Sequence, residues 1–528
     1  MSIRRPDPRA AGRNPLDKYK TSLSPEEDTP SIDNAGGRYK AIEEADEAAA
    51  FVCASTPEFT GDGEDVPTAL PVDLPQAETA RDLHQVVWQL AWPAVAAMLL
   101  QTVNSLMDVF FVGHLPNGAQ ALAATGIGGS VLFLLVSLAM GLTVGTTALV
   151  ARFTGAGDHE AATHATGQSL TLAFFSSIVI GLVFYWGRGT IVGWMLDTRR
   201  SPQAAALCVQ FLSAALLATV PVFVMNVLAA AFRGLGDTRT PMFITGVVVT
   251  THMTFNALLI YGLLGFPRMG VRGAGTAMAT SLYVGTILYL IALARWSPLK
   301  DALKREHLRL KMVWVARILK IGIPAAVQAI IRTLAMMTFS GVLARTVEGA
   351  AAIAAMQIGI RAESLAFMPG FGYSVAASTL VGQSLGARDP KRAERCGWAA
   401  TLQGVAVMTL MAVLFFTFAV PFVRIFTSQP TVLRLGVSYL RVSAFCEPFL
   451  ALGMVLTGAL QGAGDTTRPT YITIFTMWIV RLPLAVWLMF TCHMEAQGAW
   501  YAMTITTILG GLMTAALFQS GKWKRIKV

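Results

Sequence analysis

Long apolar stretches dominate this chain. From about residue 86 onward, twelve of them follow one another, each of roughly 20 or more residues, the length that a helix needs to cross a hydrocarbon core of about 30 Å. Barrel strands would be short and would alternate in polarity, whereas residues 131–136 and 411–416 are apolar throughout. The chain is 54% hydrophobic and only 14% charged, which leaves too little polar surface for a soluble globule of this size. We therefore predict an all-α integral membrane protein with twelve transmembrane helices.

Two homologous halves are indicated by motifs that recur at a nearly constant offset. The sequence RGLGDT at residues 233–238 returns as QGAGDT at residues 461–466, an offset of 228 between their first glycines (462 − 234). Pro93 returns as Pro324, and Gly155 as Gly386, both at an offset of 231 (324 − 93 and 386 − 155). A period that spans several apolar segments predicts two pseudo-symmetric lobes of six helices each. An even number of spans per repeat makes the halves parallel, so Asp237 and Asp465 should lie on the same membrane face.

The apolar pattern also predicts the bounds of the spans and domains. In half one the spans lie near residues 86–113, 119–150, 164–194, 203–232, 239–265 and 270–296, and in half two near 315–343, 350–384, 396–426, 432–461, 469–491 and 497–519. The domains that we expect are a disordered cytoplasmic tail (1–82), an N-terminal six-helix lobe (83–297), a cytoplasmic linker (298–313), a C-terminal six-helix lobe (314–520) and a basic cytoplasmic tail (521–528).

The positive charges predict the orientation. Lysines and arginines concentrate in the linker, after the eighth span and at the C-terminus, which all fall on one side if the spans alternate. By the positive-inside rule, this side should be cytoplasmic. We therefore expect a multi-pass protein of the cell (inner or plasma) membrane with both termini in the cytoplasm. The net charge of +10 then reflects topology and contact with the lipid bilayer, and no motif suggests a nucleic-acid partner.

Three motifs stand in a fixed order along these spans. Pro93 is followed by QTVNSLMDVFFVG at residues 101–113, VGQSLGA follows at residues 381–387, and the GxGDT repeats end the fourth and tenth spans. Over residues of about 86–519 the chain resembles the multidrug and toxic compound extrusion (MATE) family of secondary transporters. The resemblance implies two lobes around a central cavity and export of organic compounds in exchange for H⁺ or Na⁺. We expect the substrates to be small and cationic and the protein to be a monomer. The resemblance also implies that Asp108 is the first-helix aspartate of ion coupling.

Asp108 is a candidate coupling residue from the sequence as well. A charged group inside a span costs at least about 2.5 kcal/mol, so it should face protein or a wet cavity. Asp108 is the one clear acid within the spans of half one, and its counterpart at the offset of 231 is Phe339 (108 + 231). Asn104 lies one turn earlier on the same helix face, and Asn256 offers a further amide. We predict ion coupling by these three residues, with H⁺ favoured over the Na⁺ that the same oxygens could bind.

Half two departs from the family branch that has a glutamate in the seventh span and an aspartate in the tenth. Arg332 occupies the seventh-span position, and Glu447 lies about one turn before the tenth-span position. We expect neutralising pairs, with Arg332 or Arg361 near Glu363, and with Glu447 near Arg481. Whether these charges lock helix packing or act in the cavity or in gating stays open at this point.

Helix ends and breaks explain the remaining motifs. The Gly-x-Gly-Asp repeats also occur in intramembrane aspartyl proteases, but a glycine that ends one helix and an aspartate that caps the next explains them better. Pro93, which precedes Asp108 on the same span, is a candidate helix hinge. The polar group at residues 158–164 matches no standard metal site, so we expect no metal and no cofactor other than the coupling ion.

Three function classes remain. The favoured one is an ion-coupled antiporter that works by alternating access. The second is a lipid-linked oligosaccharide flippase of the same superfamily, which should have more than twelve spans and a cationic cavity. The third, a membrane-embedded enzyme, would need a nucleophile or a metal set within the spans, and the sequence offers neither.

Overall fold

The spans form as long helices. The computed structural model describes residues 80–195 and 201–526, and within these ranges it contains helices and turns but no β-strand. Half one comprises α2 (Ala80–Gly113), α3 (Gly118–Gly155), α4 (His159–Met195), α5 (Pro202–Ala215), α6 (Thr219–Leu235), α7 (Arg239–Tyr261) and α8 (Val271–Trp296). Half two comprises α10 (Met312–Leu343), α11 (Gly349–Gly386), α12 (Pro390–Thr417), α13 (Ala419–Arg424), α14 (Pro430–Ala444), α15 (Glu447–Gly462), α16 (Thr467–Ile474), α17 (Leu482–Val486) and α18 (Glu495–Gln519).

Twelve of these segments can cross a membrane. Eleven are long and apolar enough as single helical stretches, with α5 and α6 joined into one across a short 3₁₀ turn. The twelfth is the pair α14 and α15, which bends by 57° at a short break. The prediction of an all-α protein with twelve transmembrane helices is confirmed.

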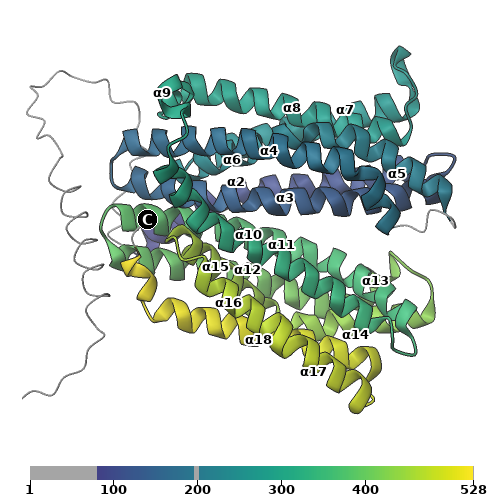
Figure 1. The fold of residues 1–528 in the computed structure, drawn as a ribbon. Helices are drawn as coiled ribbons and strands as arrows, with labels where there is room; N and C mark the ends of the chain where they lie inside the picture. The colour runs from purple at the N-terminus through teal and green to yellow at the C-terminus, as the bar shows by residue number, and fades with distance from the viewer. Residues whose placement is uncertain (1–79, 196–200, 527–528) are drawn as a thin grey trace, which may run out of the picture. The chain divides into compact units, whose positions relative to one another are not determined.

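The helices divide into two lobes that repeat the same contacts. Figure 1 shows α2 to α8 as one group and α10 to α18 as another. In half one the first span contacts the fifth, where Asn256 of α7 bonds to Asp108 of α2. In half two the seventh span contacts the eleventh in the same way, where Gln328 of α10 bonds to Thr473 of α16. The predicted pseudo-symmetric lobes are therefore present.

The lobes are joined at the end of the bundle that carries the linker, which we call the linker end. There α11 bonds across to α6, since Thr379 donates to the Arg233 carbonyl and Gln383 donates to the Gly234 carbonyl, both at 2.9 Å. Two glycines allow the closest approach. A Cβ on Gly155 would lie 1.9 Å from the Gln383 carbonyl oxygen, and one on Gly386 would lie 2.0 Å from the Arg152 carbonyl oxygen. These two contacts are related by the repeat of the two halves and seal the lobes together symmetrically.

The Gly-x-Gly-Asp repeats are capped turns, as predicted. Gly236 and Gly464 have φ angles of 92° and 85°, a left-handed conformation that ends a helix at no steric cost to glycine. Asp237 Oδ1 accepts hydrogen bonds from the backbone N–H groups of Arg239 and Thr240, and Asp465 Oδ1 accepts one from Arg468. Both aspartates are thus engaged with the start of the next helix and are not held as a catalytic pair.

The linker packs against the N-terminal lobe. It forms a 3₁₀ turn η3 (Lys300–Leu303) and the short helix α9 (Arg305–Leu308). Gln168 of α4 is fully buried, and its amide donates to the carbonyls of His307 and Arg309 at 2.8 and 2.6 Å and accepts from the Lys311 N–H at 2.8 Å. The linker should therefore move with the N-terminal lobe as one body.

The chain ends differ from simple tails where they are described. Ala80–Asp82, assigned to the N-terminal tail from sequence, begin α2, and the predicted disorder of the preceding residues falls outside the described residues. At the other end Trp523 is fully buried, and Lys524 pairs with Glu394 of α12 at 2.7 Å. The C-terminal residues are thus docked on the C-terminal lobe.

Candidate functional site

The predicted coupling residues of half one meet in a single cluster. Asn256 Nδ2 donates to Asp108 Oδ1 at 2.6 Å, which joins α7 to α2. Asn104, one turn before Asp108, accepts from the ring Nδ1 of His252 at 3.0 Å, and the other ring nitrogen of His252 lies 3.5 Å from Asp108 Oδ1. We call Asp108, Asn104, His252 and Asn256 the acid cluster.

His252 is the member that sequence reasoning missed. It lies one turn before Asn256 on the same face of α7, with 5% of its surface exposed. Asn104 and Asp108 on α2 have the same spacing of four residues as His252 and Asn256 on α7. The two pairs face one another, with His252 beside Asn104 and Asn256 beside Asp108. The spacing is visible in the sequence, but a neutral histidine in a span avoids the cost of a buried charge, so burial cost alone does not single it out.

The acid cluster has one buried acceptor without a hydrogen-bond partner. Asn256 has 1% of its surface exposed, and its Oδ1 has no hydrogen-bond partner. Asp108 keeps 40% of its side chain exposed, so other protein groups do not enclose the carboxylate. The cluster therefore offers oxygens to a proton, a water molecule or a cation, at the end of the bundle opposite the linker.

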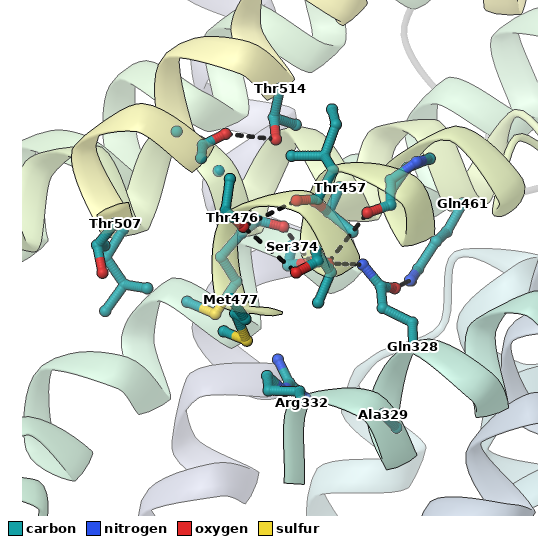
Figure 2. Close-up of a pocket in the computed structure, with 18 of the residues that line it drawn as sticks. Gln328, Ala329, Arg332, Ser374, Thr457, Gln461, Thr476, Met477, Thr507 and Thr514 are labelled. Atoms are coloured by element: carbon teal, nitrogen blue, oxygen red, sulfur yellow. Dashed lines mark hydrogen bonds between the residues drawn. The ribbon is translucent and has the colours of Figure 1, made fainter. Parts of the chain in front are cut away.

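A second polar site lies in half two. A cavity of about 210 Å³ is bounded by α10, α11, α15, α16 and α18, with α3 as the contribution from half one. Figure 2 shows Arg332 and Gln328 on one helix of this pocket, with Gln461, Thr476 and Met477 around it. Asp108 does not line this pocket, so the two sites are separate.

One wall of the pocket is a π-helical segment, η4 (Phe475–Arg481), within the eleventh span. Such wide turns are rare in helices and occur frequently at functional sites. Thr476, Met477 and Arg481 of this segment all line the pocket. Arg481 has 9% of its surface exposed and donates to the hydroxyls of Thr506 and Thr507 at 2.8 and 3.0 Å.

The ion pairs expected in half two do not form. Glu447 makes no ion pair with Arg481, and neither of its carboxylate oxygens has a hydrogen-bond partner, although only 1% of the residue is exposed. Glu363 accepts a hydrogen bond from Tyr439 at 3.0 Å and pairs with neither Arg332 nor Arg361. The cation that acts electrostatically on Glu363 is Arg481, and the acid on which Glu363 acts in turn is Glu447.

The helix break explains why Glu447 lacks the predicted partner. The break between α14 and α15 places Glu447 at the first residue of α15, followed by Pro448. There the carboxylate lies at the positive end of a helix dipole instead of within a continuous span. Pro93, the predicted hinge, lies inside α2, which continues through it without a break.

The comparisons with known proteins agree with this architecture. The family model MatE matches residues 93–258 and 324–487, one match in each lobe. The "Probable multidrug resistance protein NorM" of Thermotoga maritima is 29% identical over 464 residues, which are 86% of this chain and 95% of that protein. The "Multidrug resistance protein MdtK" of Pectobacterium atrosepticum is 27% identical over a match that covers 81% of this chain and 92% of that protein.

The fold is also that of solved transporters. A mutant of the MATE transporter VcmN of Vibrio cholerae superposes with a TM-score of 0.77 over 84% of this chain and 99% of its own, at 20% identity. The family match covers more than half of the chain and falls in both lobes of a twelve-span membrane protein. This chain belongs to the MatE family of membrane transporters.

Proposed function

We propose that this chain exports small organic compounds across a cell membrane in exchange for protons, and that Asp108 carries the proton. The multidrug resistance names of its relatives support export of organic compounds. The choice of ion rests on the acid cluster. The charge of the linker and of the C-terminal residues supports a cytoplasmic linker end, which makes the face near Asp108 the external one.

The contact between His252 and Asp108 is the observation that favours a proton over a sodium ion as the coupling ion. An amide oxygen only accepts hydrogen bonds, so His252 Nδ1, 3.0 Å from Asn104 Oδ1, must hold a hydrogen. In a neutral ring, Nε2 then has a lone pair, and it faces an oxygen of Asp108 at 3.5 Å. An ionised carboxylate and a lone pair repel each other. The arrangement is favourable when one proton resides on the pair, on His252 or on Asp108.

The interface between the lobes supports alternating access. The lobes touch through glycines and backbone carbonyls at the linker end, while the side chain of Asp108 at the opposite end stays partly exposed. This state can exchange the proton of Asp108 with the external medium. Opening the linker end would then connect the substrate pocket to the cytoplasm, in the manner of a lobe that rocks against its partner.

Reconstituted transport tests this function. Liposomes that contain the protein take up or release a cationic dye, ethidium, and an anionic dye, dansylglycine, with a pH gradient or a sodium gradient imposed separately. We expect transport of at least one dye to follow the pH gradient. Asp108→Asn keeps size and hydrogen bonding but removes the titratable group, so it should reduce transport to the level of protein-free liposomes.

The control is Asp301→Asn, which changes a linker acid that pairs with Lys304 and should leave transport unchanged. Normal transport by Asp108→Asn under a pH gradient would contradict the proposal. Transport that follows only the sodium gradient would overturn the choice of ion, and the unused oxygen of Asn256 would then be the natural cation ligand.

The alternative is a flippase for lipid-linked oligosaccharides. Within the described residues eleven helices can cross a membrane, or twelve when the bent pair α14 and α15 is counted as one span, and neither number exceeds the twelve of the exporter. The arginines of the pocket are the feature that a flippase would share. A cavity of about 210 Å³ suits a small molecule with a few rings better than a lipid-linked saccharide.

A further inference from the structure

Arg332 is an arginine in the middle of a membrane span, and no ion pair joins it to any residue that the structure describes. It lies two turns beyond Pro324 on α10, has an exposed side chain, and lines the pocket. Figure 2 shows its side chain pointing from α10 towards Met477 of the opposite wall. A guanidinium at this depth is costly in lipid, so it must face a wet cavity or a ligand.

No carboxylate balances this charge from within the pocket. None of the residues that line it is an aspartate or a glutamate, and Arg332 forms no ion pair within the described ranges. Arg481 brings a second guanidinium into the same lining. The acid that acts on Arg481 is Glu363, which is not a lining residue. The lining therefore presents the positive charge of Arg332 without an acid of its own, whereas Arg481 has Glu363 behind it.

The hydroxyl groups of the lining do not offset this. Thr473, Thr476 and Thr514 donate their hydrogens to carbonyls one turn earlier in their own helices, and Ser374 donates to the Met454 carbonyl. Gln328 donates to Thr473, and Gln461 points its amide at Gln328 (Figure 2). The amide and hydroxyl hydrogens are thus largely engaged within the protein. Arg481 is engaged as well, through its bonds to Thr506 and Thr507, so Arg332 remains the strong donor that faces the cavity.

The rest of the lining is apolar and aromatic. Phe367, Phe371 and Phe449 border the pocket together with several methionines. Aromatic rings offer large contact areas, and methionine adapts to ligands of different shape. Such a surface binds a flat apolar body and adds little specificity for any one compound.

We propose that this pocket binds organic anions: molecules with an aromatic or apolar body and one carboxylate, with Arg332 as the residue that recognises the carboxylate. Guanidinium and carboxylate match in charge and can form two parallel hydrogen bonds. The inference builds on the proposed export function and names its substrate class. It replaces the cationic substrate that we expected from the sequence, because a cation would meet two arginines and no acid in the lining of this pocket.

Equilibrium binding in detergent tests the proposal without any ion gradient. Three probes share the dansyl fluorophore: dansylglycine carries a carboxylate, its methyl ester is neutral, and dansyl-ethylenediamine carries an ammonium group. We expect the protein to bind dansylglycine about tenfold or more tightly than the ester, as the loss of a charge-assisted hydrogen bond implies. The ammonium probe should bind most weakly.

Variants assign the preference to Arg332. Arg332→Gln should bind dansylglycine and its ester with equal affinity, close to that of the ester for the unaltered protein. Retained ester binding shows that the apolar pocket is intact. Arg332→Lys should keep most of the preference, since it keeps the charge. The matched control is Arg361→Gln, an exposed arginine of α11 outside the pocket, which should behave like the unaltered protein.

The proposal is overturned if the ester or the ammonium probe binds as tightly as dansylglycine, if no probe binds, or if Arg332→Gln retains the preference. Should Arg332→Gln fail to fold, the preference of the unaltered protein and of Arg332→Lys still decides the substrate class. Because binding needs no gradient, dansylglycine can bind even if no gradient drives transport. That result would reject the coupled transport function and leave the pocket assignment standing.

Discussion

The two lobes have the same structure at the helix ends near the linker, but the charged groups inside their spans are of opposite sign. At the linker end, Gly155 and Gly386 meet equivalent carbonyls of the other lobe, and Asp237 and Asp465 cap equivalent helices. Within the spans, half one has an acid cluster and half two has a pocket with two arginines. A duplicated chain has therefore kept its backbone geometry and diverged in its buried charges.

The residues at the repeat-related positions of the two halves show where the charges differ. The counterpart of Asp108 is Phe339, which has 1% of its surface exposed in the core of half two. By the same two offsets, the counterpart of Arg332 is Gln101 (332 − 231), and the counterpart of Arg481 is Met253 (481 − 228). Neither charged site has a charged twin in the other lobe. Under our proposals, one lobe handles the ion and the other handles the substrate.

The largest effect should come from making half two resemble half one at Arg481. Arg481→Met introduces the residue of the equivalent position and leaves Glu363 without its nearby cation. Arg481 also loses its hydrogen bonds to Thr506 and Thr507, and a hydrogen bond from a charged donor contributes about 1.5–3 kcal/mol, so the free energy of unfolding should fall by about 3–5 kcal/mol. Thermal melting in detergent measures the loss, and adding Glu363→Gln to Arg481→Met should recover part of it.

Glu447 provides the comparison for that experiment. Glu447→Gln removes a carboxyl group whose oxygens have no hydrogen-bond partner, so it should leave stability unchanged or raise it. In the Arg481→Met background, it should recover less than Glu363→Gln does. If Glu447→Gln recovers more stability than Glu363→Gln, the Glu447–Arg481 pair predicted from the sequence would be supported after all.

A smaller and symmetric effect is expected at the linker end. Gly155→Val and Gly386→Val each place a Cβ about 2 Å from a backbone carbonyl oxygen of the other lobe, closer than any real contact. Each should destabilise the protein by about 1–3 kcal/mol, and by the same amount. Gly126→Val on α3, where a Cβ meets open space, is the control. Markedly unequal losses would show that the lobes are not equivalent even at this end.

The smallest effect should come from His252, which half two lacks. His252→Gln can still bond to Asn104 but removes the titrating ring beside Asp108. Proton-driven transport should fall about fivefold, in line with a partly exposed charge contact of about 1 kcal/mol, and its pH profile should report a single acid. The control is His84→Gln, which alters a histidine that bonds to Gln403 far from the cluster. An unchanged profile in His252→Gln would remove His252 from the coupling site.

Much of the architecture follows from the sequence because it depends on local properties. Twelve apolar lengths determine twelve crossings, since lipid leaves no other partner for the backbone. The glycine and aspartate of each GxGDT repeat determine a left-handed helix end and a cap, which involve only neighbouring residues. The duplicated offsets determine that the capped turns share one end of the bundle.

Which side chains of different helices come into contact was decided by the tertiary structure. The identities of Asp108 and Asn256 do not reveal how α2 and α7 are rotated, so His252 entered the cluster only when that rotation was known. Pro93 and Pro448 look alike as candidate breaks, yet α2 continues through one and the tenth span bends by 57° beside the other. Glu447 lies at that bend and Arg481 at the end of a π-helical turn, and the two side chains do not form the predicted ion pair. Charge pairing depends on distances of a few ångströms, which helix tilt and rotation set and which apolar patterning alone leaves undetermined.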